Sequence, residues 1–133
     1  MAKGGSVFAN TPIEATLPAA DLERAKRWYS ETLGLEPVQE DEYGGAHYEA
    51  GGSQFVVFLS PFAGTNQATA AGFSVDNFDD VIDQLRSKGV TFEEVDFGEL
   101  GKTVDGVISS PDGATKAAWF KDSVGNILSV TSM

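Results

Sequence analysis

The sequence predicts an α+β fold of two tandem βαβββ modules, with the helices on one face of the sheet. Three observations lead to this prediction. The length of 133 residues is ordinary for one domain, 41% of the residues are hydrophobic, and the order strand, helix, glycine, strand occurs twice. The expected helix caps, Asp21 and Asn77, lie 56 residues apart, and the glycines that end the helices, Gly34 and Gly89, lie 55 residues apart.

The repeat sets the expected domain organisation. Residues 1–133 are predicted to form a single domain, with the first module at 13–60 and the second at 68–131. Only one helix is expected for every four strands, which excludes a doubly wound parallel sheet and favours helices on one face of the sheet.

The first module begins with the short alternating strand Ile13–Leu17. A helix follows, capped by Asp21 and ended by Gly34, and its apolar side chains recur at helical spacing. Pairs of glycines that suit hairpin turns separate the remaining segments. These expected strands are Leu35–Glu40, Ala46–Ala50 and Gln54–Ser60.

The second module repeats this order, beginning with a strand at Ala71–Val75. Asn77 and Asp80 have the spacing of a capping box, and the helix that they start is expected to end at Gly89. After the helix, alternation again predicts strands. They are Thr91–Phe97, Ala117–Lys121 and Ile127–Thr131, with an additional candidate at Val104–Ser109.

Composition excludes several classes of function. The chain has 20 acidic and 9 basic residues, a net charge of −11, so it lacks the basic surface that nucleic acids and anionic membranes require. It has no cysteine, which rules out disulfides, iron–sulfur clusters and thiol nucleophiles. Residues 1–12 contain no apolar run of the length that a signal peptide needs, and no other run is long enough to span a membrane, so a cytoplasmic protein is expected.

The acidic excess is spread evenly over the chain. Residues 1–67 carry a net charge of −5 and residues 68–133 carry −6. We therefore interpret the net negative charge as a general surface property that aids solubility, and it gives only weak support for a cationic ligand.

Three motifs carry a resemblance to a known family. They are Leu17–Tyr29 followed by Leu33–Leu35, then Phe73–Asn77 with Leu85–Val90, and finally Trp119–Asn126, in which Ser123 replaces the usual proline of an F-x-D-P-x-G-N hairpin. Together with the repeat, they make the chain resemble the vicinal oxygen chelate superfamily over Ile13–Thr131. That superfamily contains glyoxalases, bleomycin-resistance proteins and extradiol dioxygenases, and the resemblance implies that the two modules form a curved mixed sheet around a cavity, with the helices on the outer face. One such fold hosts many chemistries, so the resemblance implies the fold more strongly than the function.

The resemblance also implies where a divalent metal would bind. Family enzymes take their ligands from the first and last strands of each module, and the matching positions here are Glu14, Val56, Ala70 (or Thr69) and Ser129. Only Glu14 is a useful ligand, whereas three or more convergent ligands are normal. We therefore expect no cofactor and no metal site of the family type. Glu14 is the single candidate ligand among the family positions.

Strand alternation then predicts the walls of a metal-free cavity. Small and aromatic side chains would make a mostly apolar pocket with a few polar handles. The predicted ligand-binding residues are Glu14, Thr16, His47, Gln54, Phe58, Ser74, Trp119 and Ser129. A metal site made of Glu14, His47 and Glu49 would not be the family arrangement, and no catalytic residue is assigned.

The main hypothesis is a binding protein similar to the bleomycin-resistance branch, with Trp119 and Phe58 stacking a planar, cationic small molecule. One alternative is a metal-dependent lyase, isomerase or dioxygenase that uses Glu14 as a ligand. A second alternative is a non-catalytic protein-interaction module. The resemblance also implies a homodimer.

Overall fold

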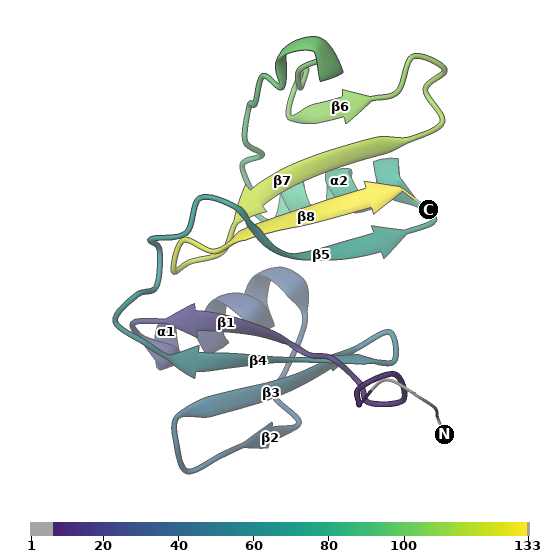
Figure 1. Cartoon of the computed structure of the whole chain (residues 1–133). Coiled ribbons are helices and arrows are strands. Elements are labelled where there is room, and N and C mark those ends of the chain that lie inside the picture. Colours follow the sequence, from purple (N-terminus) through teal and green to yellow (C-terminus); the bar gives the residue numbers. More distant parts are fainter. Residues whose placement is uncertain (1–6, 133) are drawn as a thin grey trace.

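The structure is a computed structural model that describes residues 7–132, so the ends of the expected domain, residues 1–6 and 133, lie outside the described residues. Its strands form two four-stranded sheets, with the orders β1-β4-β3-β2 and β5-β8-β7-β6 (Figure 1). The first sheet contains β1 (Ala15–Ala19), β2 (Gln39–Glu40), β3 (Gly45–Ala50) and β4 (Ser53–Leu59). The second contains β5 (Thr69–Val75), β6 (Val107–Ser109), β7 (Lys116–Lys121) and β8 (Ile127–Ser132).

The pairing pattern is the same in both sheets. The first strand of each module pairs in parallel with the last, β1 with β4 and β5 with β8. The other pairs are antiparallel, as hairpin connections require. This arrangement confirms the predicted α+β class and its mixed sheets.

The first helix, α1 (Leu22–Trp28), begins and ends as the sequence predicts. Asp21 Oδ1 accepts a hydrogen bond from the amide of Arg24 at 3.1 Å, which caps the first turn. The helix continues as a π turn, η1 (Tyr29–Leu33), and stops at Gly34, whose φ of 71° favours glycine.

The second helix, α2 (Phe78–Ser87), buries Phe78, Ile82 and Leu85 against its sheet. It starts at Asn77 as predicted, but the expected capping box is wrong. The Asn77 amide group donates to Asp80 Oδ2 at 3.5 Å and does not cap the backbone. Neither this helix nor any other within residues 7–132 is long and apolar enough to cross a membrane.

The prediction of a continuous strand at Thr91–Phe97 is wrong. That segment makes only isolated bridges, such as Phe92 with Phe120, and leads into the short 3-10 turn η2 (Gly98–Leu100). The reason is that its polar groups bond to the loop that follows. Glu94 Oε1 accepts from Thr103 Oγ1 at 2.7 Å, for example.

Two other predicted strands are shorter in the structure. The segment Leu35–Glu40 pairs only over β2, and Val104–Ser109 pairs only over β6. The latter takes the place of Thr91–Phe97 as the edge strand of its module, so each module keeps the βαβββ order.

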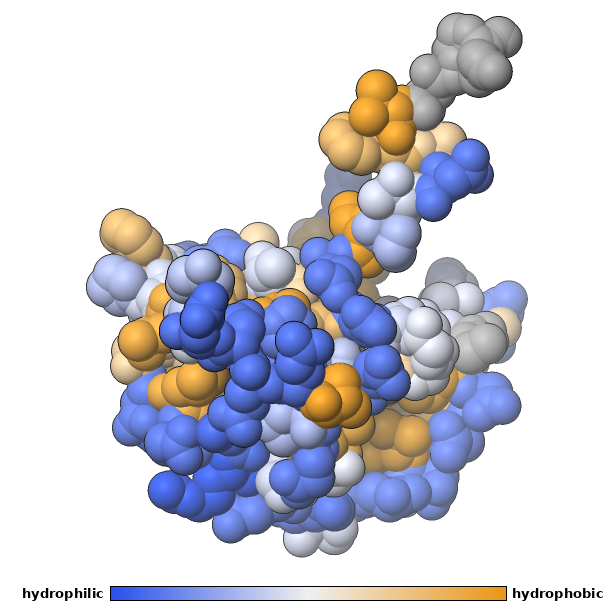
Figure 2. Space-filling model, turned by 90° about the horizontal axis from the view of Figure 1, so that it is seen from below, coloured by the Kyte–Doolittle hydropathy of each residue, from blue (hydrophilic) through white to orange (hydrophobic). Residues whose placement is uncertain are grey.

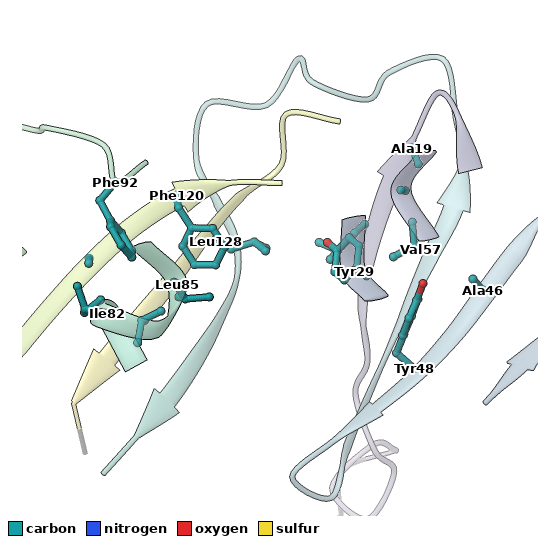
Figure 3. Packing of buried hydrophobic residues seen from close by; sticks show 14 of the residues in the cluster. Ala19, Tyr29, Ala46, Tyr48, Val57, Ile82, Leu85, Phe92, Phe120 and Leu128 are labelled. Atoms are coloured by element: carbon teal, nitrogen blue, oxygen red, sulfur yellow. The ribbon is translucent and has the colours of Figure 1, made fainter. Parts of the chain in front are cut away.

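One hydrophobic cluster spans both modules. Trp28 of α1 packs on Phe120 of β7 with ring centroids 6.2 Å apart. In Figure 3, Tyr29 lies between Leu128 of the second module and Val57 of the first. All three are buried, so the modules share a single core.

A buried hydrogen-bond network also joins the modules. The Tyr29 hydroxyl donates to Asp122 Oδ2 at 2.8 Å. The side-chain amide of Asn126 donates both to Asp122 Oδ2, at 2.9 Å, and to the carbonyl of Pro18 in β1, at 3.0 Å. Burial raises the pKa of Tyr29 and the charge of Asp122 raises it further, so the phenol stays a hydrogen-bond donor.

We expect Asp122→Ala to lower the free energy of unfolding by roughly 3 kcal/mol, because it leaves Tyr29 and Asn126 buried without an acceptor. Urea unfolding measures the loss. The matched control is Asp112→Ala, which removes an exposed carboxylate from a surface turn and should cost less than about 1 kcal/mol. Equal losses in the two variants would contradict a special role for the buried network.

The β7–β8 turn offers a stabilising substitution. Gly125 N donates to Asp122 O at 3.2 Å, which makes Ser123 the second residue of a four-residue turn, and its buried hydroxyl has no partner. Proline is favoured at that position. Ser123→Pro should therefore raise the unfolding free energy by about 0.4–1 kcal/mol, as measured by thermal or urea unfolding. Val124→Pro should instead destabilise, since the Val124 amide donates to Asp122 Oδ1 at 3.0 Å.

Candidate ligand-binding site

Each sheet packs one face against a helix, and we call the opposite face of each sheet its helix-free face. In β1 the burial alternates, with Leu17 and Ala19 buried and Thr16 exposed. The same alternation places most of the predicted site residues on the helix-free faces. They are Thr16, His47, Gln54 and Phe58 in the first sheet and Ser74, Trp119 and Ser129 in the second. Glu14 is exposed and lies just ahead of β1.

The strand register aligns residues of neighbouring strands on each helix-free face, and equivalent positions of the two sheets can be compared. In the first sheet Val56 pairs with Thr16 on one side and with His47 on the other. In the second sheet Ser129 occupies the equivalent middle position and pairs with Gly72 and Trp119. The first strands and last strands thus meet at Thr16–Val56 and at Gly72–Ser129.

The second helix-free face carries an aromatic platform. The Trp119 ring lies 5.2 Å from that of Phe97, which is 39% exposed. Hydroxyl groups lie beside it, since Ser129 pairs with Trp119 and Ser74 Oγ is 3.4 Å from Thr131 Oγ1. Sequence reasoning missed Phe97 because it placed this residue at the end of the expected strand Thr91–Phe97, which does not form.

His47 has a carboxylate partner that sequence reasoning also missed. Its Nε2 is 2.7 Å from Asp41 Oδ2, and Asp41 Oδ1 accepts the amides of Tyr43 and Gly45 at 2.9 Å each. The His47 hydrogen bond is the main cause that lowers the pKa of Asp41, and the backbone amides lower it further. The pair therefore stabilises the β2–β3 hairpin.

The residues present do not fit the divalent metal that the family resemblance implies. Within residues 7–132, no three His, Cys, Asp or Glu side chains are grouped so that they could hold a metal ion. Of the positions named from the resemblance, Val56 and Ala70 offer no side-chain ligand atom. Gly72, which the structure pairs with Ser129, offers none either. Glu49 accepts a hydrogen bond from Gln54 at 3.1 Å, and His47 is held by Asp41.

A cavity of about 620 Å³ lies between the two modules. Gln54 and Ser74 line it, whereas the other six predicted residues do not. Most of its walls come from residues on the helix side of the sheets, such as Leu17, Phe55 and Phe73. Figure 2 shows that the surface seen from below is largely hydrophilic, with hydrophobic patches between the polar residues.

Comparison with known proteins places the chain in a family. Residues 12–126 match the Glyoxalase/Bleomycin resistance protein/Dioxygenase superfamily, so the chain belongs to that superfamily. No protein with a curated description matches the chain.

Solved structures share the fold at low sequence identity. A glyoxalase family protein from Enterococcus faecalis is 18% identical with a TM-score of 0.69, and the match covers 94% of this chain and 99% of that one. Lactoylglutathione lyase from Agrobacterium tumefaciens is 17% identical with a TM-score of 0.68, over 94% of this chain and 95% of that one. At these identities the likeness shows the fold alone.

The Asp41–His47 pair predicts a specific titration. In His47→Ala the pKa of Asp41 should rise toward its ordinary value, because the main hydrogen bond that lowers it is gone. Carboxyl ¹³C NMR across pH measures this change. Asp112, whose pKa is lowered by Ser110 and a backbone amide, is the internal control and should not move.

The sign of the linked stability follows from the same shift. The folded state lowers the pKa of Asp41, so the carboxylate stabilises the fold above its unfolded pKa of about 3.9. That contribution is lost as the pH falls through the lower, folded value. His47→Ala should therefore flatten the loss of stability below about pH 4, and an unchanged acid limb would contradict the assignment.

Proposed function

We propose that this protein binds a small planar molecule on the helix-free face of the second module, where the ligand stacks on Trp119. The observation that carries the proposal is the partly exposed ring pair of Trp119 and Phe97, whose ring centroids lie 5.2 Å apart. Exposed aromatic faces of this kind favour planar or cationic partners.

Polar groups around the platform would orient the ligand. The hydroxyls of Ser74, Thr131 and Ser129 lie on the same face and can donate or accept hydrogen bonds. The backbone amide of Glu93 donates to the carbonyl oxygen of Trp119 at 2.7 Å, which brings the Glu93 carboxylate to this part of the sheet. There Glu93 Oε1 lies 3.8 Å from Lys121 Nζ.

Charge favours a cationic ligand over an anionic one. With 20 acidic and 9 basic residues, the surface potential attracts cations and repels anions. The ligand of the proposal is therefore a planar cation, bound by stacking and hydrogen bonds rather than through a metal. The homodimer and the cytoplasmic location expected from the sequence stay predictions.

The test is calorimetry of the intact chain against a panel of planar cations and cationic glycopeptide antibiotics. We expect binding by the wild type and at least a tenfold loss of affinity in Trp119→Ala, about the energy of one good stacking contact. Phe62→Ala is the matched control, since it removes an aromatic ring that is 74% exposed in the linker between the modules. Binding heat that is absent across the panel, or unchanged in Trp119→Ala, would overturn the proposal.

A further inference from the structure

We propose a second binding site, for a neutral and mostly apolar small molecule, in the cavity between the two modules. It goes beyond the proposed function because Trp119 and Phe97 take no part in it. Its walls come mainly from the helix side of both sheets, with Leu17 and Phe55 from the first and Phe73 and Leu128 from the second.

The size and chemistry of this cavity suit a ligand. Its volume of about 620 Å³ lies within the range of small-molecule sites. Within residues 7–132, no Asp, Glu, Lys or Arg side chain lines this first cavity, although 22% of the chain is charged. A charged ligand would lose its hydration there without gaining an ionic partner, so the lining selects a neutral one.

Apart from Tyr29, the polar side chains that line the cavity belong to exposed residues. Ser53, Gln54 and Ser74 supply hydroxyl and amide groups and are all exposed. The Tyr29 hydroxyl also belongs to a lining residue, but it already donates to Asp122. The ligand should therefore place its apolar body inside the cavity and one hydrogen-bonding end near solvent.

The site is elongated. A second hollow of about 330 Å³ extends toward α2, and it shares Ala50, Phe73 and Val75 with the first cavity. Its walls include Val81 and Leu85 of α2, which continue the apolar surface, and also the polar residues Thr32, Gln84 and Lys88, so the uncharged lining is confined to the first cavity. A long, narrow ligand can thus contact both modules at once. Water in such an apolar space has few hydrogen-bond partners, so an apolar ligand displaces it readily.

The test uses N-phenyl-1-naphthylamine, a neutral dye whose emission rises in apolar sites. We expect a saturable rise with the wild type and at least a tenfold weaker affinity in Ala50→Phe and Ala71→Phe, which fill the cavity. The matched control is Ala117→Phe, since Ala117 is also a half-buried strand alanine but lies on the helix-free face and outside the cavity. Circular dichroism identifies which variants fold, and one folded variant, either Ala50→Phe or Ala71→Phe, is enough for the comparison of dye affinity.

The outcomes separate the two sites. Trp119→Ala should keep its affinity for the dye and lose affinity for the planar cation. Ala71→Phe should lose affinity for the dye and keep its affinity for the planar cation. The proposal is overturned if the wild type shows no saturable rise, if the filled variants bind as tightly as Ala117→Phe, or if anionic anilinonaphthalene sulfonate binds as tightly as the neutral dye. It is also wrong if the dye binds only at protein concentrations low enough for sedimentation to find monomer. In that case a second copy of the chain occupies the cavity at higher concentrations.

Discussion

The buried carboxylate of Asp122 holds the two modules in one arrangement. It accepts hydrogen bonds from Tyr29 in the first module and from Val124 and Asn126 in the closing hairpin of the second. Because Asn126 also donates to Pro18 in β1, the hairpin is tied to the first sheet as well as to the first helix. The relative position of the two helix-free faces, and the cavity between the modules, both depend on this contact.

The repeat made the fold readable from the sequence, since caps such as Asp21 and stops such as Gly34 depend on local chemistry. The prediction from local pattern was wrong where side chains and amides of a later loop form hydrogen bonds with the groups of an expected strand. Thr91–Phe97 alternates like a strand, but the amide of Val95 bonds to Thr103 Oγ1 at 2.8 Å and Glu94 accepts from Gly106 N at 2.9 Å. A ladder cannot use groups that a following loop has already taken.

The candidate site was predictable to the extent that it follows strand alternation. The faces of Thr16, Ser74 and Trp119 follow from a period of two once the helices cover one side of each sheet. Phe97 and the cavity between the modules were not predictable. Both depend on how segments far apart in the chain come together in space, which no single strand encodes.

The pairing of Gly72 with Ser129 shows how far this chain stands from metal chemistry. A Cβ at position 72 would clash with Ser129 Oγ, so the buried serine occupies the space that a larger side chain would need. Placing a carboxylate or imidazole at 72 therefore requires a change at 129 as well. The first sheet would also need to exchange the apolar Val56 for a ligand. Several coupled substitutions separate this pair of strands from a metal site, whereas the proposed stacking of a planar ligand on the aromatic platform needs none of them.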